Sequence, residues 1–369
     1  MSGISGISDI DVLKFGGSTF RTPADFPRLA KDLAQRLRHS GRTLVVVVSA
    51  MPGETEALRG RLSEIVRHPS EGSVAGLLTL ADTVAARLLA ACLEDLGLTS
   101  RVLAGHQQGI TTEGSPMWAR IAHIAREPLR SAARSADVVI VPGGQAQDAD
   151  GTPTWLGKNS SDLTAVALAV AAGAATCEIH SDVDGVYTCD PHLVPDSTLM
   201  SSLSYEHAER LSGYGAKVLH RDAVALAREH GITIHCRSNR APYAEGTVIS
   251  STGTAPGAVV LNRNSTALRF PSTDRSEEAA RLLNEAGITA FPTDTDAGPC
   301  VVVAGGYVDI DATFSRLALT PGVPVGIPVI GVGADHAVTR LAADAEASVV
   351  VARQLHHQLA NSFERTSFA

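Results

Sequence analysis

A lysine stands beside two glycines near the start of the chain, in the segment Lys14-Phe15-Gly16-Gly17-Ser18. The segment follows the apolar pair Val12-Leu13 and precedes a helical pattern from Pro23, which predicts a strand-to-helix turn. Glycine lets backbone N–H groups approach an anion closely, and lysine adds a mobile positive charge. The turn therefore predicts a site that holds a phosphate group and stabilises it during transfer. An ordinary tight turn with a surface lysine is the alternative.

Three further polar stretches follow strand-like runs or open helices. Ser49–Thr55 follows the Val-rich run Leu44–Val48, and Ser181–Pro191 follows the run Cys177–His180. Leu156–Asp162 brings a lysine and two serines to the start of an Ala-rich helix. Taken alone, Ser49 and Thr55 are better explained by helix capping and Ser181–Pro191 by a surface turn, whereas Leu156–Asp162 fits a helix cap and an anion site equally well. Because ligands of open α/β sheets bind beyond the carboxyl ends of the strands, the stretches together predict one crevice.

The composition narrows the class of protein. The chain has 369 residues, and its 44% hydrophobic but only 4% aromatic content favours Ala, Val, Leu and Ile cores around buried parallel strands. The net charge of -8, without a basic stripe, argues against a nucleic-acid partner. Five cysteines without Cys-x-x-Cys spacing predict reduced thiols in a cytoplasmic protein. No signal peptide and no uninterrupted apolar run of bilayer length is seen, so no membrane partner is expected.

Strand-like and helical runs alternate along most of the chain. Continuous apolar runs predict buried strands, and 3.6-residue spacing predicts helices. This alternation predicts a three-layer α/β/α fold around a mostly parallel sheet. The predicted strands are Val12–Phe15, Leu44–Val48, Arg101–Leu103, Asp137–Val141, Cys177–His180 and Ile232–Cys236. The predicted helices are Phe26–Leu37, Ala75–Leu96, Trp118–Ala133, Asp162–Ala172 and Tyr214–His230.

A cluster of Ser, Thr, Gly, Pro and Asn at 251–263 predicts a boundary between domains of residues 1–263 and 264–369. Beyond it, strands at Ala267–Phe270, Ile288–Phe291 and Cys300–Ala304 with a helix at Glu277–Glu285 predict a small β-α-β-β unit.

Taken in order, the motifs resemble those of aspartate kinases, members of the amino acid kinase family. The resemblance covers about residues 11–250, and its segments are Lys14–Ser18, Val47–Thr55, Leu156–Ala165, Asp182–Pro191 and Gly215–His220. It implies an amino acid kinase catalytic domain in residues 1–263. It also implies transfer of the ATP γ-phosphoryl group to the side-chain carboxylate of L-aspartate, which gives 4-phospho-L-aspartate.

The resemblance also assigns roles by position in the motifs. Lys14 would contact the transferring phosphate, and Asp162 would orient the catalytic lysines. The residues that would hold the nucleotide are Gly16, Gly17, Ser18, Ser181, Asp182, Tyr187, Asp190 and Lys217. The residues that would hold the amino-acid substrate are Ser49, Thr55, Asp82, Lys158 and Ser161. Mg²⁺ would bridge the ATP phosphates and be held by them and by water, so no protein metal ligands are expected.

Four departures from the family pattern keep other functions open. Lys158 stands for an arginine that grips the substrate α-carboxylate, and Asp82 for a glutamate that meets the substrate amino group. His192 replaces an arginine, and Pro142–Gln145 lacks the usual phenylalanine. A relative that phosphorylates another small carboxylate is therefore a second hypothesis. A non-catalytic subunit of the same fold is a third, which the retention of Lys14, Asp162 and Lys217 disfavours.

The C-terminal region resembles the ACT regulatory domains of aspartate kinases in part. Ile327–Gly333 resembles the first strand and turn of an ACT domain, and Ser348–Val351 and Leu355–His357 resemble its last strand and helix. Because the stretch between them is short, we expect a small, degenerate α+β ACT-like region that serves homodimerisation. An unrelated α/β appendage is the alternative.

Overall fold

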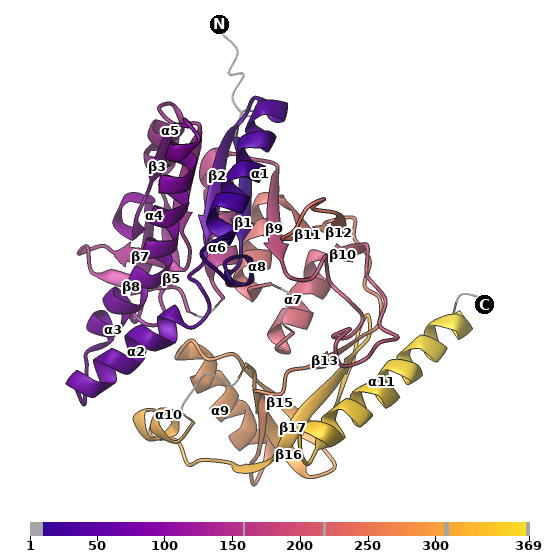
Figure 1. Ribbon diagram of the computed structural model, residues 1–369. Coiled ribbons are helices and arrows are strands. Elements are labelled where there is room, and N and C mark those ends of the chain that lie inside the picture. Colours follow the sequence, from indigo (N-terminus) through magenta and orange to yellow (C-terminus); the bar gives the residue numbers. More distant parts are fainter. Residues whose placement is uncertain (1–9, 158, 217–218, 306–309, 367–369) are drawn as a thin grey trace, which may run out of the picture. The chain divides into compact units, whose positions relative to one another are not determined.

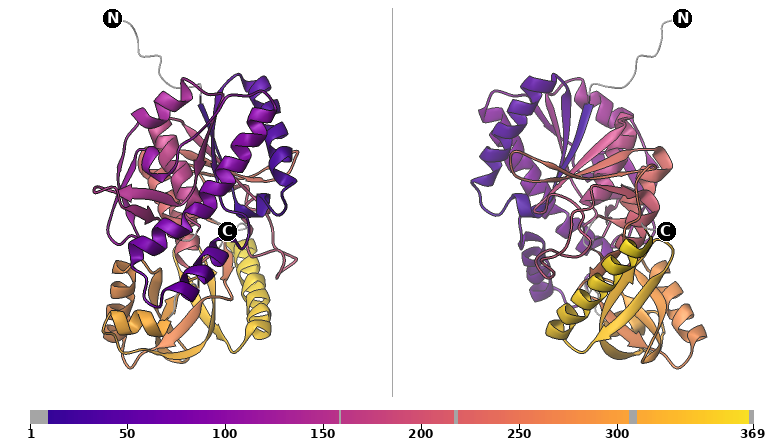
Figure 2. Two further views of the ribbon diagram at one scale, coloured as in Figure 1. Left: turned by 60° about the vertical axis from the view of Figure 1, so that its left-hand side comes forward. Right: turned by 90° about the vertical axis from the view of Figure 1, so that its right-hand side faces the viewer.

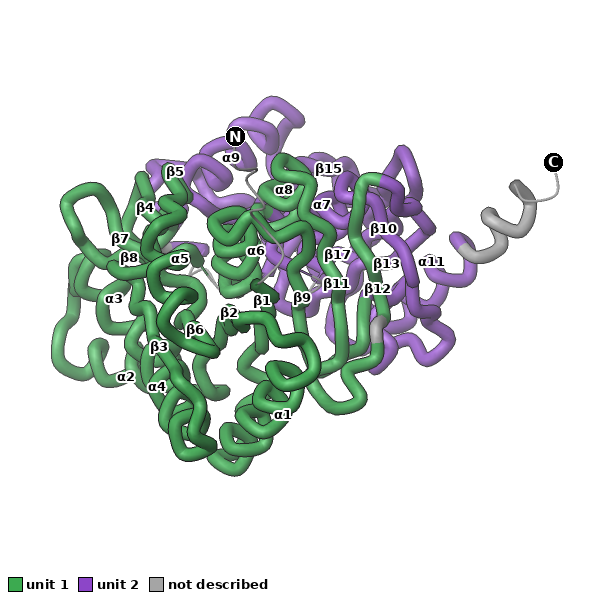
Figure 3. Tube along the Cα trace, turned by 90° about the horizontal axis from the view of Figure 1, so that it is seen from above, with its two compact units in different colours: residues 1–185, 222–251 green, residues 186–221, 252–369 purple. Residues whose placement is uncertain are grey.

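The computed structural model describes residues 10–157, 159–216, 219–305 and 310–366. They form two compact units, shown in different colours in Figure 3. Unit 1 holds the residues up to 185 and residues 222–251, and unit 2 holds residues 186–221 and those from 252 onward. The chain passes from unit 1 to unit 2 for the last time after residue 251, within the segment where the composition changes. Residues 186–221, however, belong to the same unit as the C-terminal part. The domain limits 1–263 and 264–369 stay a prediction.

Unit 1 is built from alternating strands and helices, labelled in Figure 1. Its strands are β1 (Ile10–Phe15), β2 (Thr43–Val48), β3 (Ser100–Val102), β4 (Ile110–Glu113), β5 (Arg120–Ile124), β6 (Val138–Pro142), β7 (Gln145–Asp148), β8 (Pro153–Trp155), β9 (Thr176–Ser181), β11 (Thr233–Ser238) and β12 (Glu245–Ser250). Its helices are η1 (Gly17–Thr19), α1 (Asp25–Ser40), α2 (Glu54–Ile65), α3 (Glu71–Leu78), α4 (Leu80–Asp95), η2 (Gly105–Gln107), α5 (Glu127–Ala133), α6 (Ser161–Ala172) and α8 (Arg221–His230), of which α8 enters the unit at its second residue.

A mostly parallel sheet forms the middle layer of unit 1. Its strands run in the order β12-β11-β9-β1-β2-β6-β3, and only the β11–β12 pair is antiparallel. Helices α1 and α4 cover one face, and α5, α6 and α8 cover the other (Figure 3). The predicted three-layer fold is therefore confirmed.

The central strands form because their residues are apolar without interruption. Every residue from Leu44 to Val48 is fully buried, as are Val138 to Val141 in the next strand. Helix α6 is also buried around most of its circumference, and its alanines let it lie close to the sheet. Since β1, β2, β6, β9 and β11 are all parallel, their carboxyl ends meet at one edge of the sheet.

A second, smaller sheet of unit 1 corrects one prediction. Its order is β5-β4-β7-β8, and its first strand occupies part of the helix predicted at Trp118–Ala133. Arg120–Ile124 pairs with β4 instead, and the helix begins only at Glu127. Pro128 lies in the first turn of that helix, where its missing N–H is tolerated. The long helix predicted from the sequence therefore starts about nine residues too early.

Two other predicted helices are shorter or broken. The prediction Ala75–Leu96 splits into α3 and α4 at Thr79, whose carbonyl accepts a hydrogen bond of 2.9 Å from the buried side chain of Gln145. Of the described residues in the prediction Tyr214–His230, those from Arg221 onward are helical, and Gly215 has a left-handed φ of 94° that departs from helix geometry. In both cases a tertiary contact or a glycine overrides the apolar spacing.

Unit 2 is an α+β unit with an antiparallel sheet. Its strands run in the order β13-β17-β14-β16-β15, and β18 pairs with β17. Helix α11 packs along β13, β17 and β18, as both views of Figure 2 show. Its elements are β10 (Ser202–Ser204), α7 (Tyr205–Gly213), β13 (Ala258–Leu261), β14 (Thr266–Arg269), α9 (Thr273–Glu285), β15 (Ala290–Thr295), β16 (Gly298–Val303), α10 (Ile310–Arg316), β17 (Val323–Val332), β18 (Ala337–Ala342) and α11 (Ala345–Thr366).

The predicted β-α-β-β unit is confirmed as β14, α9, β15 and β16. The strand predicted at Ser348–Val351 is wrong, because these residues belong to α11. Asp344 begins this helix by accepting hydrogen bonds from the N–H groups of Glu346 and Ala347, at 2.9 and 2.8 Å. The valine run favours a strand, but Ser348, Ala352 and Leu355 lie on one buried helix face.

One stretch of the described chain, Glu71–Asp95, is long and apolar enough to cross a membrane by length and composition. It consists of the two helices α3 and α4, which separate at Thr79. Ala85, Leu89 and Leu93 of the second helix are buried in the main core of unit 1. One face of α4 therefore packs in the core, whereas Leu80, Val84 and Leu88 of the same helix are exposed.

Candidate active site

A buried ion pair lies at the carboxyl edge of the main sheet. Lys14 projects from β1, and its Nζ lies 2.8 Å from Oδ1 of Asp162 in the first turn of α6. The two side chains are only 11% and 8% exposed. The carboxylate also lies at the positive end of the helix dipole. This arrangement fixes a cation where the strand meets the glycine turn, as the sequence predicts.

The glycines of the site are explained by close backbone approach. A Cβ atom on Gly16 would lie 3.2 Å from Lys14 Nζ, and one on Gly17 would lie 2.7 Å from the carbonyl oxygen of Ala50. A Cβ atom on Gly143, after β6, would lie 2.4 Å from Cβ of Ser161. A larger residue at Gly17 or Gly143 would push the turn after β1 or the start of α6 away from the sheet, whereas one at Gly16 would crowd the end of the Lys14 side chain.

Two predicted substrate residues meet each other directly. Ser49 follows β2, and its hydroxyl donates to Ser161 Oγ over 2.9 Å. The backbone N–H of Ser49 donates to Phe15 O over 3.2 Å, so the serine pair is tied to the turn that carries Lys14. Thr55 lies in the first turn of α2, and no hydrogen bond joins it to the serine pair among the described residues.

Asp82 faces the same region from the first turn of α4. Its Oδ1 accepts a hydrogen bond of 2.8 Å from the backbone N–H of Ala50. Burial raises the pKa of Asp82 to about 7, although the bond from Ala50 and the charge of Lys14 act in the opposite direction. The carboxyl group therefore holds the loop after β2, and it changes charge near neutral pH.

The predicted nucleotide residues are divided between the two units. Ser181 ends β9 beside the glycine turn, and its hydroxyl donates to Val183 O over 2.8 Å. Asp182 forms a half-exposed ion pair of 3.6 Å with Arg21. Tyr187 and Asp190 belong to unit 2, where Tyr187 bridges Leu199. Lys158 and Lys217, predicted for substrate and nucleotide, lie outside the described residues.

One buried polar residue at the carboxyl edge of the main sheet was not predicted from the sequence. Asn239 follows β11, is 2% exposed, and donates from Nδ2 to both Ser18 Oγ and Thr19 Oγ1 at 3.1 Å. The predicted strand ended at Cys236, two residues before the observed end. A longer strand would have placed Asn239 at the same edge as Ser18, because β11 is parallel to β9 and β1.

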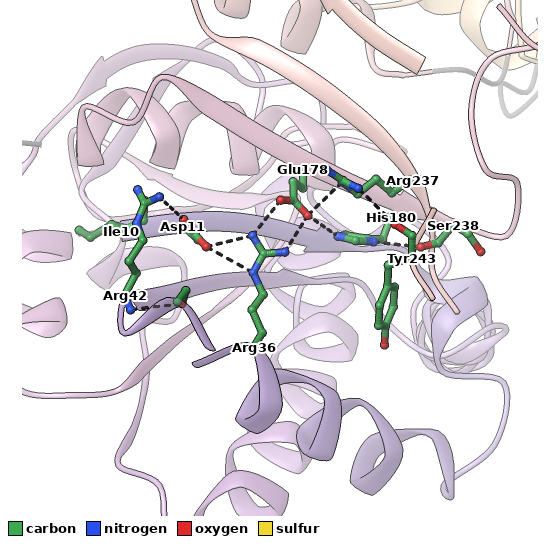
Figure 4. A network of polar contacts seen from close by, with 10 residues as sticks. Ile10, Asp11, Arg36, Arg42, Glu178, His180, Arg237, Ser238 and Tyr243 are labelled. Carbon is green, nitrogen blue, oxygen red and sulfur yellow. Dashed lines mark hydrogen bonds and ion pairs between the residues drawn. The ribbon is translucent and has the colours of Figure 1, made fainter. Parts of the chain in front are cut away.

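A polar network supports this edge from the face that α1 covers (Figure 4). Arg36 donates to both oxygens of Glu178, at 2.8 and 2.9 Å, and to Asp11 at 2.9 Å. Glu178 also meets His180 Nε2 at 3.2 Å. Burial raises the pKa of Glu178, but hydrogen bonds and positive charge from His180 and Arg36 outweigh it and hold the pKa well below its usual range. The carboxylate is therefore charged at any working pH.

Thiols and metal ligands contribute little to this edge. Burial raises the pKa of Cys177 and Cys236 far above neutral, so both pack as uncharged groups near Asp162. All five cysteines are free. Within the described ranges, no group of three or more His, Cys, Asp or Glu side chains is arranged to hold a metal ion.

Comparison with known proteins shows the family of the chain. The model of the amino acid kinase family matches residues 9–238. An aspartokinase of Thermus thermophilus is 36% identical over 241 residues, which are 64% of this chain and 58% of the relative. That of Bacillus sp. strain MGA3 is 38% identical over 238 residues, 64% and 57% of the two chains.

Two solved structures share the fold. Aspartokinase III of E. coli, in complex with aspartate and ADP, aligns over 88% of both chains with a TM-score of 0.68 and 19% identity. Aspartate kinase from Synechocystis aligns over 88% of this chain and 60% of its own, with a TM-score of 0.56 and 26% identity. An alignment of that extent must reach beyond residue 238 into unit 2, whose antiparallel sheet fits an ACT-like region.

The chain therefore belongs to the amino acid kinase family. Its relatives within that family include the aspartokinases named above. The aligned part spans less than two thirds of the length of those relatives.

Proposed function

We propose that the protein transfers the γ-phosphoryl group of ATP to the side-chain carboxylate of L-aspartate, giving ADP and 4-phospho-L-aspartate. The observation that carries the proposal is the buried Lys14–Asp162 pair beside the glycine turn. Relatives at 36% and 38% identity are aspartokinases, and the structure of one aspartokinase holds aspartate and ADP. These comparisons support aspartate as the acceptor and ATP as the donor.

In this reaction a carboxylate oxygen of the acceptor forms a bond to the γ-phosphorus, and the bond from that phosphorus to the β,γ-bridging oxygen breaks. The acceptor is already ionised, so the protein need not remove a proton. Its task is to align the two reactants and to stabilise negative charge. Lys14 would neutralise charge on the moving phosphoryl group, and Asp162 would hold the lysine in place.

The remaining predicted residues would position the reactants. Gly16, Gly17 and Ser18 would contact the phosphates, and Ser181, Asp182, Tyr187, Asp190 and Lys217 would hold the rest of the nucleotide. Ser49, Thr55, Asp82, Lys158 and Ser161 would hold the acceptor. Mg²⁺ would bind to phosphate oxygens and water. The bound ion would neutralise phosphate charge.

A second acceptor is worth testing because of Asp82. Its carboxyl group is partly neutral near pH 7 and already accepts a bond from Ala50. A weakened hold on a substrate ammonium group would favour a small dicarboxylate without an amino group. The hypothesis of a non-catalytic subunit is opposed by the intact Lys14–Asp162 pair, which such a subunit has no need to keep.

The deciding experiment measures ADP release with ATP and Mg²⁺ in the presence of L-aspartate, L-glutamate, succinate or L-malate. Hydroxylamine traps the acyl phosphate as a hydroxamate, which separates transfer to the acceptor from simple ATP hydrolysis. We expect hydroxamate from L-aspartate above all other acceptors. Hydroxamate from succinate or malate alone would replace aspartate by another acceptor, and none from any would support the non-catalytic hypothesis.

We further propose that the protein is a cytoplasmic homodimer joined through its C-terminal region. Reduced cysteines and the need for ATP support the compartment. The mass in solution, measured by light scattering after size exclusion, tests the dimer, and a monomer at micromolar concentration would contradict it.

A further inference from the structure

Asn239 occupies a fixed position at the edge that carries the proposed phosphate turn. Its backbone N–H donates to Ser181 O over 2.6 Å, which joins it to the end of β9. The preceding residue, Ser238, pairs with Ser181 in the sheet register. Two strands of unit 1 therefore hold the backbone from which the amide side chain projects.

The network of Figure 4 also holds this backbone in place. The carbonyl oxygen of Ser238 lies 3.0 Å from Nδ1 of His180, and the other ring nitrogen of His180 lies 3.2 Å from Glu178 Oε2. The ring also stacks on Phe15 with a centroid distance of 4.5 Å. Because Glu178 is in turn held by two bonds from Arg36, Ser238 cannot move without disturbing several charge-assisted bonds.

The amide of Asn239 points at two hydroxyl groups of the turn. Its Nδ2 lies 3.1 Å from both Ser18 Oγ and Thr19 Oγ1. Thr19 is buried, whereas Ser18 is partly exposed. An amide nitrogen has two N–H groups and no acceptor, so it can donate one bond to each hydroxyl oxygen.

This contact determines which way the hydroxyl of Ser18 points. A hydroxyl group has one O–H donor and two acceptor lone pairs, and the hydrogen rotates to suit its surroundings. When the amide donates to the oxygen, the O–H cannot point back at Asn239. It is left to donate on the accessible side of the turn, where an anion can accept it.

We propose that Asn239 is a positioning residue for ATP, which acts by orienting the Ser18 hydroxyl so that it donates to a phosphate oxygen. The proposal rests on the proposed function, because it requires a nucleotide phosphate at this turn. The opposite orientation of the amide would make Oδ1 accept both O–H groups and would remove them from the phosphate. A purely structural amide would stabilise the fold without affecting nucleotide affinity.

The test compares three variants of the full chain by the Kd of ATP, measured by calorimetry without acceptor, and by the two KM values. Asn239→Leu removes the amide, and Asn239→Asp offers only acceptors and so turns the hydroxyl inward. We expect the Kd of ATP to rise about fivefold or more in the first variant and further in the second. The KM of the acceptor should change less than about twofold. The third variant, Ser18→Ala, removes the hydroxyl itself.

A double-mutant cycle with Ser18→Ala isolates the mechanism. In the alanine background, Asn239→Leu should weaken ATP binding by less than about twofold, since the group on which the amide acts is absent. Asn284 of unit 2 supplies the matched control, because its amide also donates two bonds, to Ala280 O and Ala290 O at 2.7 and 2.6 Å. Asn284→Leu should lower the Tm and leave the Kd of ATP unchanged.

The outcomes separate this proposal from the proposed reaction. Normal ATP affinity in folded Asn239→Leu and Asn239→Asp proteins, or effects that simply add to those of Ser18→Ala, would overturn the role of Asn239 while aspartate phosphorylation stands. The expected losses of ATP affinity in a protein that phosphorylates no carboxylate would support Asn239 and overturn the proposed acceptor. A native chain that binds no ATP would overturn both.

Discussion

The carboxylate of Asp82 accepts a hydrogen bond from the backbone N–H of Ala50 at 2.8 Å, and so joins the start of α4 to the loop after β2. The sequence motif suggests contact with a substrate for this residue. The structure shows that it also supports the loop that carries Ser49. One carboxyl group therefore links the stability of the edge to the acceptor region.

Asp82 predicts a pH-dependent stability. Burial raises its pKa from 3.8 to about 7, so the native carboxyl keeps a proton that the unfolded chain releases above about pH 4. Stability therefore falls as the pH rises from about 4 to about 7, and the loss is complete above that range. Asn keeps an acceptor for Ala50 but cannot ionise, so Asp82→Asn should stabilise the fold by about 1–3 kcal/mol near pH 8 and by much less near pH 4. Denaturant unfolding at both values checks this, and an equal change at both would contradict it.

Lys14 predicts separate effects on turnover and stability. Lys14→Met should lower kcat by about a hundredfold or more, because it removes a preorganised charge. It should also lower the unfolding free energy by about 3–5 kcal/mol, since Asp162 is left buried without its cation. Adding Asp162→Asn should restore most of the stability and none of the activity. Steady-state rates and denaturant unfolding test this, and recovery of turnover in the double variant would exclude the catalytic role.

A substitution of Gly143 tests how much crowding the start of α6 tolerates. A Cβ atom there would lie 2.4 Å from Ser161 Cβ and 2.9 Å from its Cα, so Gly143→Ala must displace the first turn of α6. We expect a loss of about 1–3 kcal/mol and a higher KM for the acceptor. Gly60 is the matched control, because it lies in α2 with no atom within 4 Å of an added Cβ. Gly60→Ala should stabilise by up to about 1 kcal/mol without changing KM. Equal behaviour of the two variants would show that the contact at Gly143 does not constrain the site.

The C-terminal unit predicts weak regulation by amino acids. In the described part of the chain, β17 and β18 are joined directly by residues 333–336, and α11 packs on these two strands, whereas α9 packs on β15 and β16. The short connection leaves no room for a helix between β17 and β18, so we expect few of the differential contacts by which an effector biases two conformations. We expect lysine and threonine, alone or together at about 5 mM, to change the initial rate by less than about 20%. Strong inhibition at low millimolar concentration would reveal a complete effector site.

Much of the edge could be predicted because it depends on local patterns. Lys14 lies near the end of a strand-like run, Ser49 and Ser181 follow such runs, and parallel strands bring these residues together. The contact of Asp82 with Ala50 could not be predicted, because it depends on how α4 lies against the sheet. The same holds for Thr79, where a buried glutamine divides a helix that the apolar spacing makes continuous.

Other errors came from local signals that compete. The valines at 349–351 favour a strand, yet Asp344 caps a helix over them and the core accepts one helical face. Residues 120–124 have a helical spacing of apolar residues, but they form a strand that pairs with β4. The helix begins later, at Glu127, with Pro128 in its first turn. The position of Asn239 at the edge was not predicted, because the last residues of the strand before it are polar. A search for apolar runs therefore ends the strand too early.

The pairing of strand β17 affects how unit 2 unfolds. Its first residues pair with β14, and its last residues pair with both β13 and β18. Gly326 lies between these parts with a φ of 133°, and a Cβ atom there would lie 2.4 Å from Ala342 O. The two halves of the sheet thus share one uninterrupted backbone, so neither can melt without taking a strand from the other. Heat or denaturant should break unit 2 as a single cooperative element, and its amide hydrogens should exchange with solvent as one group.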